Sequence, residues 1–333
     1  MDDAKHLYVS DDPETFKTHG KLFHAKLPDR GTVARILFDH VNGTSVPPGA
    51  TGAAMRVIVA IVNTGRDAAG IAIRGNDVEP SANGMDVGHR ATMEYLKAHE
   101  IDPGAGLALF TVEGGDAHVL SDHVLQPGAP GAGGHPGRTG DCTAGIFDFE
   151  SQVAGAEFEL RIIACDPSSD LSSFDDLPDL PTDGKQRRGI FDITGTAIPS
   201  AIAYGGGPVT IGPEHQFYPH VPGDAYAGPG HTGEYGVLKR FRCDVSGPQT
   251  GRLAQSARGA GNATATYVID GELLQSHQFA PNPFLEVTTF DVAAGRRRTV
   301  SVVTMAEINS TLPVQLSMGP TTTQIAQAPI FRA

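Results

Sequence analysis

Side chains that could ligate a metal ion gather in one stretch of the sequence, EHQFYPHVPGDAYAGPGHTGEYG at 214–236. The candidate ligands are three histidines and one aspartate: His215, His220, His231 and Asp224. Imidazole and carboxylate groups both suit Zn²⁺, Cu²⁺ and Fe²⁺. Their spacing matches no established ligand motif, because the stretch contains neither HxH nor HExxH. A divalent metal site and a surface loop without an ion both remain open, and the spacing favours the loop.

The same stretch carries two tyrosines, Tyr218 and Tyr226, which are candidate ligand-binding residues. A tyrosine ring has an apolar face and a polar tip, so these rings could stack on a sugar or pack against a protein partner. Long insertions on rigid sandwiches are usually binding loops or disordered segments. We therefore expect any binding by this loop to involve the two rings.

Other templates for catalysis are missing from the sequence. It contains no GxSxG nucleophile elbow, no phosphate-binding GxxxxGK[ST] loop and no dinucleotide-binding GxGxxG. The three cysteines, Cys142, Cys165 and Cys243, form no CxxC pair, and we expect them to be buried as small apolar residues. These features favour a protein that is not an enzyme and has no cofactor other than the divalent metal considered above.

Two histidines occur in the repeated tripeptide Asp-His-Val, as His40 and His123. Neighbouring side chains of a strand point to opposite faces, so Asp39 and His40 cannot both face one ion. The internal alignment described next places Ile193 opposite His40 and Phe290 opposite His123. Both histidines are therefore predicted to be packing residues whose ring nitrogens form local hydrogen bonds.

The two halves of the sequence resemble one another, which predicts a duplicated module. Five segments of the first half align with five of the second in the same order. They are RILFDHVNGT (35–44) with RGIFDI-TGT (188–196), MRVIVAIVNTG (55–65) with VLKRFRCDVSG (237–247), GIAIRG (70–75) with AQSARG (254–259), HVLSDHVLQPG (118–128) with LEVTTFDVAAG (285–295), and FELRIIACD (158–166) with RTVSVVTMA (298–306).

Most of these segments have the features of strands. YGVLKRFRCDV alternates between apolar and charged residues, and Asp270-Gly271 in TYVIDGELLQ predicts a type I′ hairpin turn. Only VGHRATMEYLKAHE at 87–100 reads as a helix. With 41 glycines and 24 prolines, the composition is typical of short strands joined by turns. We therefore predict an all-β chain of two related β-sandwich domains, jelly-roll or immunoglobulin-like, with one short helix inserted in the first.

The predicted division of the chain follows from these patterns. It consists of an N-terminal arm at 1–19, a first sandwich at 20–165, an acidic linker at 166–186 and a second sandwich at 187–333 with a long loop at 197–234. The linker is rich in Asp, Pro and Ser and poor in large apolar residues.

The charge of the chain limits its partners. A formal net charge of −13 argues against nucleic acid or an anionic membrane surface as partner. The longest apolar run, VIVAIV at 57–62, is too short for membrane insertion, since about 20 residues are needed. No signal peptide is visible at the start, so a cytosolic protein and a mature secreted form both remain open.

Three segments of the second half, GEYGVLKRFRCDVSGP, ARGAGNATATYVIDG and PFLEVTTFDVAAGRRRTVSVVTM, resemble modules of uncharacterised bacterial surface or secreted proteins. The first half, through RILFDHVNGT and VIVAIVNTG, is similar to the N-terminal portion of the same proteins. This resemblance implies an extracytoplasmic location and a non-catalytic role, and it assigns no catalytic residue.

Three hypotheses for function follow. The first is a non-catalytic module that binds a glycan, polymer or protein partner at the cell surface. The second is a metal-dependent enzyme that uses the His-rich loop at 215–231. The third is a structural subunit of an oligomeric surface assembly, which we would favour if residues 1–20 crossed to a neighbouring chain.

Overall fold

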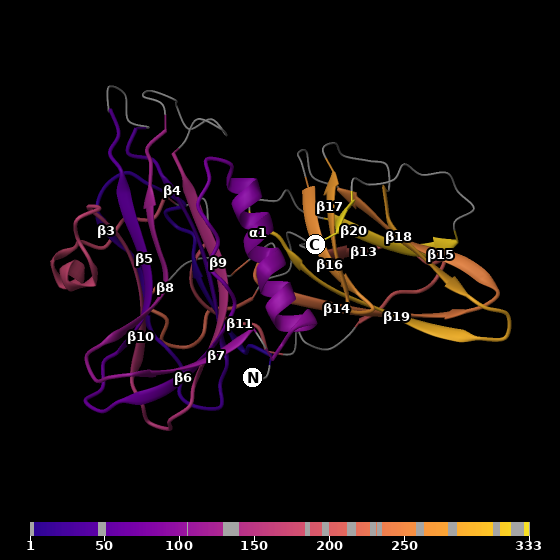
Figure 1. Cartoon of the computed structure of the whole chain (residues 1–333), viewed down its shortest axis with the longest axis horizontal. Helices are drawn as coiled ribbons and strands as arrows, with labels where there is room; N and C mark the ends of the chain where they lie inside the picture. The colour runs from indigo at the N-terminus through magenta and orange to yellow at the C-terminus, as the bar shows by residue number, and fades with distance from the viewer. Residues whose placement is uncertain are drawn as a thin grey trace.

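The chain forms two β-sandwiches side by side with one helix between them (Figure 1). The computed structural model describes residues 3–45, 51–104, 106–128, 140–183, 187–194, 200–211, 218–226, 231, 235–257, 263–278, 285–308, 314–320 and 330–332. The predicted all-β fold of sandwich domains with a single inserted helix is thereby confirmed.

The first sandwich, called module 1 below, packs a large sheet against a small one. The large sheet has the order β11-β1-β4-β9-β6-β7 with β2 beside β4, and the small sheet has the order β3-β10-β5-β8. Its strands are β1 (His6–Ser10), β2 (Thr15–Phe16), β3 (Gly20–Lys26), β4 (Ala34–Asn42), β5 (Met55–Asn63), β6 (Ala69–Arg74), β7 (Leu107–Val112), β8 (Ala117–Leu125), β9 (Cys142–Ser151), β10 (Phe158–Cys165) and β11 (Arg188–Asp192).

The second sandwich, module 2, has the same construction. Its sheets have the orders β12-β14-β19-β16-β17-β21 and β13-β20-β15-β18. Its strands are β12 (Ser200–Ala201), β13 (Val209–Ile211), β14 (Leu238–Ser246), β15 (Gln249–Ala257), β16 (Ala263–Ile269), β17 (Glu272–Gln278), β18 (Leu285–Val292), β19 (Arg297–Ala306), β20 (Val314–Pro320) and β21 (Ile330–Arg332).

The two modules match strand for strand. Strands β4 to β10 occupy the same places in module 1 as β14 to β20 in module 2, and β12 pairs in parallel with β14 as β1 does with β4. Even the register shift is repeated, at Val59/Ala60 where β5 meets β8 and at Leu253/Ala254 where β15 meets β18. The duplication predicted from the sequence is therefore present in the topology.

The detailed alignment predicted from the sequence differs from this match in four of its five pairs. Only β8 with β18 is paired correctly, which keeps His123 opposite Phe290 across the shared register shift. The counterpart of β4 is β14, whereas β11, its predicted match, lies in the same sheet as β4 on the other side of β1. Adjacent strands of a sandwich share the same alternating pattern, so an alignment slips by one strand at little cost in similarity.

Two segments outside the predicted sandwiches belong to module 1. The segment predicted as an N-terminal arm contains β1, which lies between β11 and β4 in the large sheet. The predicted acidic linker packs on the small sheet through the buried side chains of Phe174 and Leu180. The second domain was predicted to start at residue 187, but β11 (Arg188–Asp192) completes the large sheet of module 1.

The helix α1 (Gly84–Leu96) is joined to a π-helical turn at Lys97–Ile101, close to the predicted bounds of 87–100. The side chain of Asn83 accepts a hydrogen bond from the backbone N–H of Asp86 and so caps its start. Figure 1 shows the helix between the modules, and contacts with β9 and β16 hold it there. A buried contact of 2.7 Å joins His89 Nδ1 to Glu307 Oε2 of module 2.

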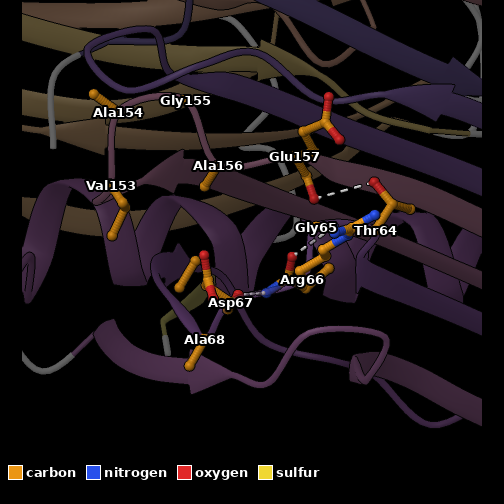
Figure 2. Close-up of a pocket in the computed structure, with 12 residues that line it drawn as sticks. Thr64, Gly65, Arg66, Asp67, Ala68, Val153, Ala154, Gly155, Ala156 and Glu157 are labelled. Carbon is orange, nitrogen blue, oxygen red and sulfur yellow. Dashed lines mark hydrogen bonds between the residues drawn. The ribbon is translucent and has the colours of Figure 1, made fainter.

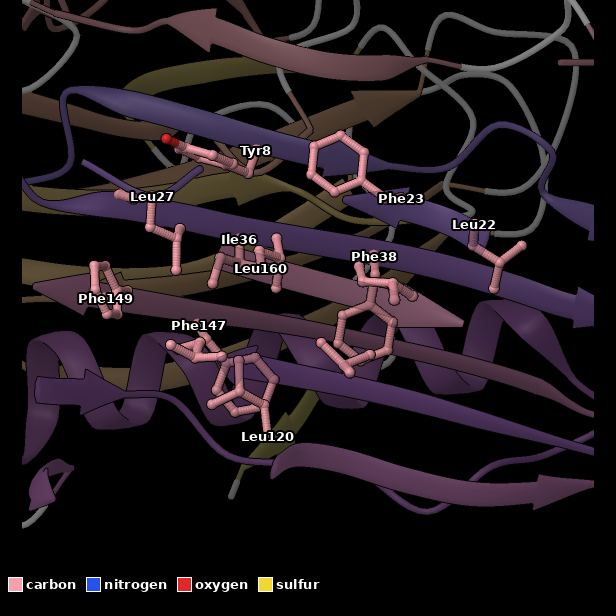
Figure 3. Close-up of a cluster of buried hydrophobic side chains, with 14 of the residues drawn as sticks. Tyr8, Leu22, Phe23, Leu27, Ile36, Phe38, Leu120, Phe147, Phe149 and Leu160 are labelled. Carbon is pink, nitrogen blue, oxygen red and sulfur yellow. The ribbon is translucent and has the colours of Figure 1, made fainter. Parts of the chain in front are cut away.

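Each module has its own apolar core. Figure 3 shows part of the first, in which Phe38, Phe147 and Phe149 of the large sheet face Leu22 and Leu160 of the small one. The hairpin turn predicted at Asp270-Gly271 is also confirmed, because both residues adopt positive φ angles.

A third apolar cluster joins the modules. It takes Val87, Ala91 and Tyr95 from the helix, and Val303 and Ile308 from module 2. The two sandwiches therefore share buried apolar surface and form one packed unit.

Candidate functional site

The predicted metal-ligand loop packs against the edge of module 1. Asp224 accepts hydrogen bonds through Oδ2 from the backbone N–H of Ile190 at 2.7 Å and from His220 Nδ1 at 2.5 Å. Its Oδ1 accepts from the N–H of Tyr226 at 3.1 Å. The carboxylate thus ties the loop to β11, and three donors already use its oxygens.

His231 is turned into the interior, where only 1% of its surface is exposed. Its Nε2 donates to the carbonyl oxygen of Tyr235 at 2.8 Å, and burial lowers the pKa of the ring to about 4. The Phe191 ring contacts both imidazoles, at 4.5 Å from His220 and 5.2 Å from His231 between ring centroids. His220 and His231 are therefore held by aromatic packing on β11.

The fourth predicted ligand, His215, lies outside the described residues. Within the part of the chain that the structure describes, no three His, Cys, Asp or Glu side chains are arranged to hold a metal ion.

The two predicted ligand-binding tyrosines are packed into the molecule. Tyr218 is 6% exposed and accepts a hydrogen bond from Lys239 Nζ at 3.1 Å. The Tyr226 ring stacks on Phe23 at 4.9 Å, and its hydroxyl bonds the backbone N–H and carbonyl of His24. The Arg188 guanidinium lies 4.7 Å from the centre of the same ring. Both rings anchor the loop to its neighbours.

The two Asp-His-Val histidines occupy different environments. His40 is fully buried, and its Nδ1 donates to the Pro13 carbonyl at 3.1 Å while Nε2 accepts from Ser10 Oγ at 2.8 Å. Burial lowers its pKa to about 4. His123 is nearer the surface, and its contact of 2.7 Å with the Asp77 carboxylate raises its pKa. The prediction of a locally hydrogen-bonded packing residue is confirmed for His40.

A group of charged side chains is buried where module 1 meets module 2. Arg35 Nε donates to Asp148 Oδ1 at 2.9 Å, and the two side chains are 2% and 0% exposed. The Tyr95 hydroxyl donates to Asp148 Oδ2 at 2.8 Å, and Arg35 also donates to the carbonyl of Gly236 at 3.1 Å. Asp148 therefore balances the charge of Arg35 in the interior, which gives the group a structural role.

A cavity of about 510 Å³ opens between the β5–β6 turn and the β9–β10 turn (Figure 2). Thr64 Oγ1 donates to the backbone carbonyl of Glu157 at 3.2 Å across its mouth. Arg66, Asp67 and Glu157 supply its charged side chains, and the rest of the lining is mostly alanine, glycine and backbone. No aromatic ring lines it, so it offers no platform for stacking on a sugar.

Among the described residues, four of the six exposed large apolar side chains lie on β7 and β8, the edge strands of the two sheets of module 1; the other two are Ile101 and Val153. Leu109 and Phe110 of β7 are 70% and 37% exposed, and Val119 and Val124 of β8 are 44% and 43% exposed. The rings of Phe110 and His118 are tilted against one another with 3.9 Å between their centroids, so the two edges lie close together. We call β7 and β8 with these side chains the β7–β8 flank.

The sequence did not predict the exposure of the β7–β8 flank, because apolar residues of a strand are normally assigned to a core. Leu107–Val112 reads LALFTV, and nothing in that run distinguishes a buried central strand from an exposed edge. The absence of Lys, Asp or Pro from an edge strand is informative only once the topology is known.

No protein family model and no curated protein matches the chain. Solved structures with low similarity to it include the following two. Lac15 from a marine microbial metagenome is 14% identical over 90% of this chain and 56% of that chain, with a TM-score of 0.18. The CBM22-1-CBM22-2 tandem domain of Paenibacillus barcinonensis Xyn10C is 10% identical over 96% of this chain and 99% of that chain, with a TM-score of 0.16. The chain thus spans little more than half the length of the first of these structures.

Among the described residues, no helix has the length and apolar character needed to cross a membrane.

Proposed function

We propose that this chain is a non-catalytic module that binds a protein partner through the β7–β8 flank. One observation carries the proposal: large apolar side chains are exposed on both edge strands at this side of module 1, Leu109 and Phe110 on β7 and Val119 and Val124 on β8. Exposed apolar patches of this kind mark sites of protein interaction. An open strand edge also offers backbone N–H and C=O groups to an added strand.

A protein partner fits the flank better than a glycan does. Three of its four side chains are aliphatic, whereas sugar rings are best bound on flat aromatic faces. Of the rings expected to supply such faces, Tyr218 is buried, and Tyr226 is half-buried with its ring stacked on Phe23. For the location we propose the cell surface, on the basis of the resemblance of the sequence to bacterial surface proteins.

A photo-crosslinking experiment tests this function. A photoreactive amino acid is placed at Leu109 or at Val119, and at the exposed Lys17 as a control, in cells that produce the full chain. We expect adducts of discrete mass from positions 109 and 119 and none from position 17. If position 109 forms no protein adduct, or the same adducts as position 17, the flank is not a binding surface.

A further inference from the structure

The edge of β7 that does not pair with β6 is the part of the flank that indicates most specifically what kind of partner it binds. On one side β7 pairs with β6 from Ala69↔Val112 to Arg74↔Leu107. On its other side no strand lies within the described residues. Positions 108–111 are all exposed, as expected for a strand at the edge of a sheet. Such an edge is a template for one more strand.

Module 2 shows what this position in the fold accepts. Strand β17 holds the place in module 2 that β7 holds in module 1. There the edge is covered by β21, which pairs antiparallel to β17 with Leu274↔Arg332 and Ser276↔Ile330. The duplicated fold therefore takes an extra antiparallel strand at this edge, and in module 1 no strand of the described residues takes that place.

From this we infer that β7 of a second copy of the chain pairs antiparallel with β7 and joins the large sheets of two copies into one. This inference rests on the proposed function and names the partner.

Charge permits a second copy at this edge, although it opposes one elsewhere on the surface. Each chain carries a formal net charge of −13, so two copies repel over most of their surfaces. Leu107–Val112 contains no charged residue, so the strand is a place where two acidic copies can approach without opposing like charges directly. Pairing of a strand with its own copy also satisfies both edges at once and closes the assembly at two.

The side-chain pattern restricts the register. Ala108, Phe110 and Val112 lie opposite Ile73, Ile71 and Ala69, which belong to the core of module 1. Leu107, Leu109 and Thr111 face the other side. A two-fold axis between antiparallel edges keeps each face on its own side, so the axis passes through residue 109 or residue 110. The same residue of both copies then lies directly opposite itself across the axis.

The test is the molecular mass of the full chain in solution, measured by sedimentation equilibrium over a range of concentrations. We expect a dimer of twice the 34.9 kDa chain mass. Leu109→Lys should weaken the dimer more than about tenfold, because a charge replaces a buried apolar contact on or beside the axis. The matched control is Ile101→Lys, which places the same charge on an exposed apolar residue outside β7 and should change the dissociation constant less than about twofold.

A disulfide test fixes the geometry. The native cysteines are buried and unpaired, so a new cysteine at the edge can be oxidised selectively. Either Leu109→Cys or Phe110→Cys should form a disulfide-linked dimer, whereas Ile101→Cys should not. The circular dichroism spectrum of each variant checks that it is folded.

Three results overturn the inference. They are a wild-type chain that stays monomeric at about 0.1 mM, a dimer that Leu109→Lys leaves unchanged, and oxidation that links Ile101→Cys as well as the β7 cysteines. The crosslinking experiment separates this failure from that of the proposed function. Adducts at position 109 with a different protein keep the function and refute the second copy, whereas no adducts refute both.

Discussion

Removal of the Asp148 carboxylate tests the buried charged group between the modules. In Asp148→Ala the guanidinium of Arg35 loses the carboxylate that accepts its hydrogen bonds, while Arg35 stays 2% exposed. The hydroxyl of Tyr95 loses its acceptor in the same change. Breaking one partner of a buried pair costs about 3–5 kcal/mol, because the remaining charge is left without compensation. We therefore expect the free energy of unfolding to fall by about this amount and Tm by roughly 10 °C.

The assay is urea unfolding followed by far-ultraviolet circular dichroism, since the chain has no tryptophan to report by fluorescence. The control is Asp86→Ala, which breaks the exposed pair with Arg90 and should cost less than about 0.5 kcal/mol. A double variant, Arg35→Leu with Asp148→Leu, removes both charges and should recover about 2 kcal/mol relative to Asp148→Ala. A cost below about 1 kcal/mol for Asp148→Ala would refute the reasoning.

Three further predictions concern pH, metal and helix packing. Because burial lowers the pKa of His40 and of His231 to about 4, the unfolded chain binds protons that the folded chain does not between about pH 6.5 and 4. Stability should fall on acidification through this window, and His40→Gln should reduce the slope of the urea midpoint against pH; an unchanged slope contradicts the assignment. Elemental mass spectrometry of the purified protein should find less than about a tenth of a Zn, Cu or Fe atom per chain, since three donors already use the Asp224 carboxylate. A value near one atom per chain would support the predicted metal site instead. Gly88→Ala should lower Tm although alanine favours helices, because its Cβ would meet the Ile308 carbonyl oxygen, and Gly104→Ala, with open space around it, should not.

The sequence predicted the type of fold well because strands, turns and helix each have a local signature. The Asp270-Gly271 turn and the single helix are local features, and both are where they were expected. The predicted repeat is present in the topology, but most segments of the first half were aligned with the strand before their true counterpart in the second half. Which strand lies beside which depends on pairing between distant segments, and LALFTV of β7 carries no mark of its partner.

The candidate site shows the same limit. The sequence placed His220, His231 and Asp224 in one loop, but it could not show that Phe191 of β11 packs against both imidazoles. A polar side chain in a loop looks like a ligand until its hydrogen-bond partners are known. For Asp224 those partners include a backbone N–H of β11, far away in the sequence.

The helix between the modules has a consequence for synthesis of the chain on the ribosome. Module 1 emerges first, and the apolar side chains of Val87, Ala91 and Tyr95 are then without Val303 and Ile308, which cover that cluster in the finished protein. Until β19 has been made, the nascent chain carries an unfinished apolar surface on its helix. Contact with module 2 covers this apolar surface of module 1. A chain cut between the two modules should therefore aggregate, while the full chain folds.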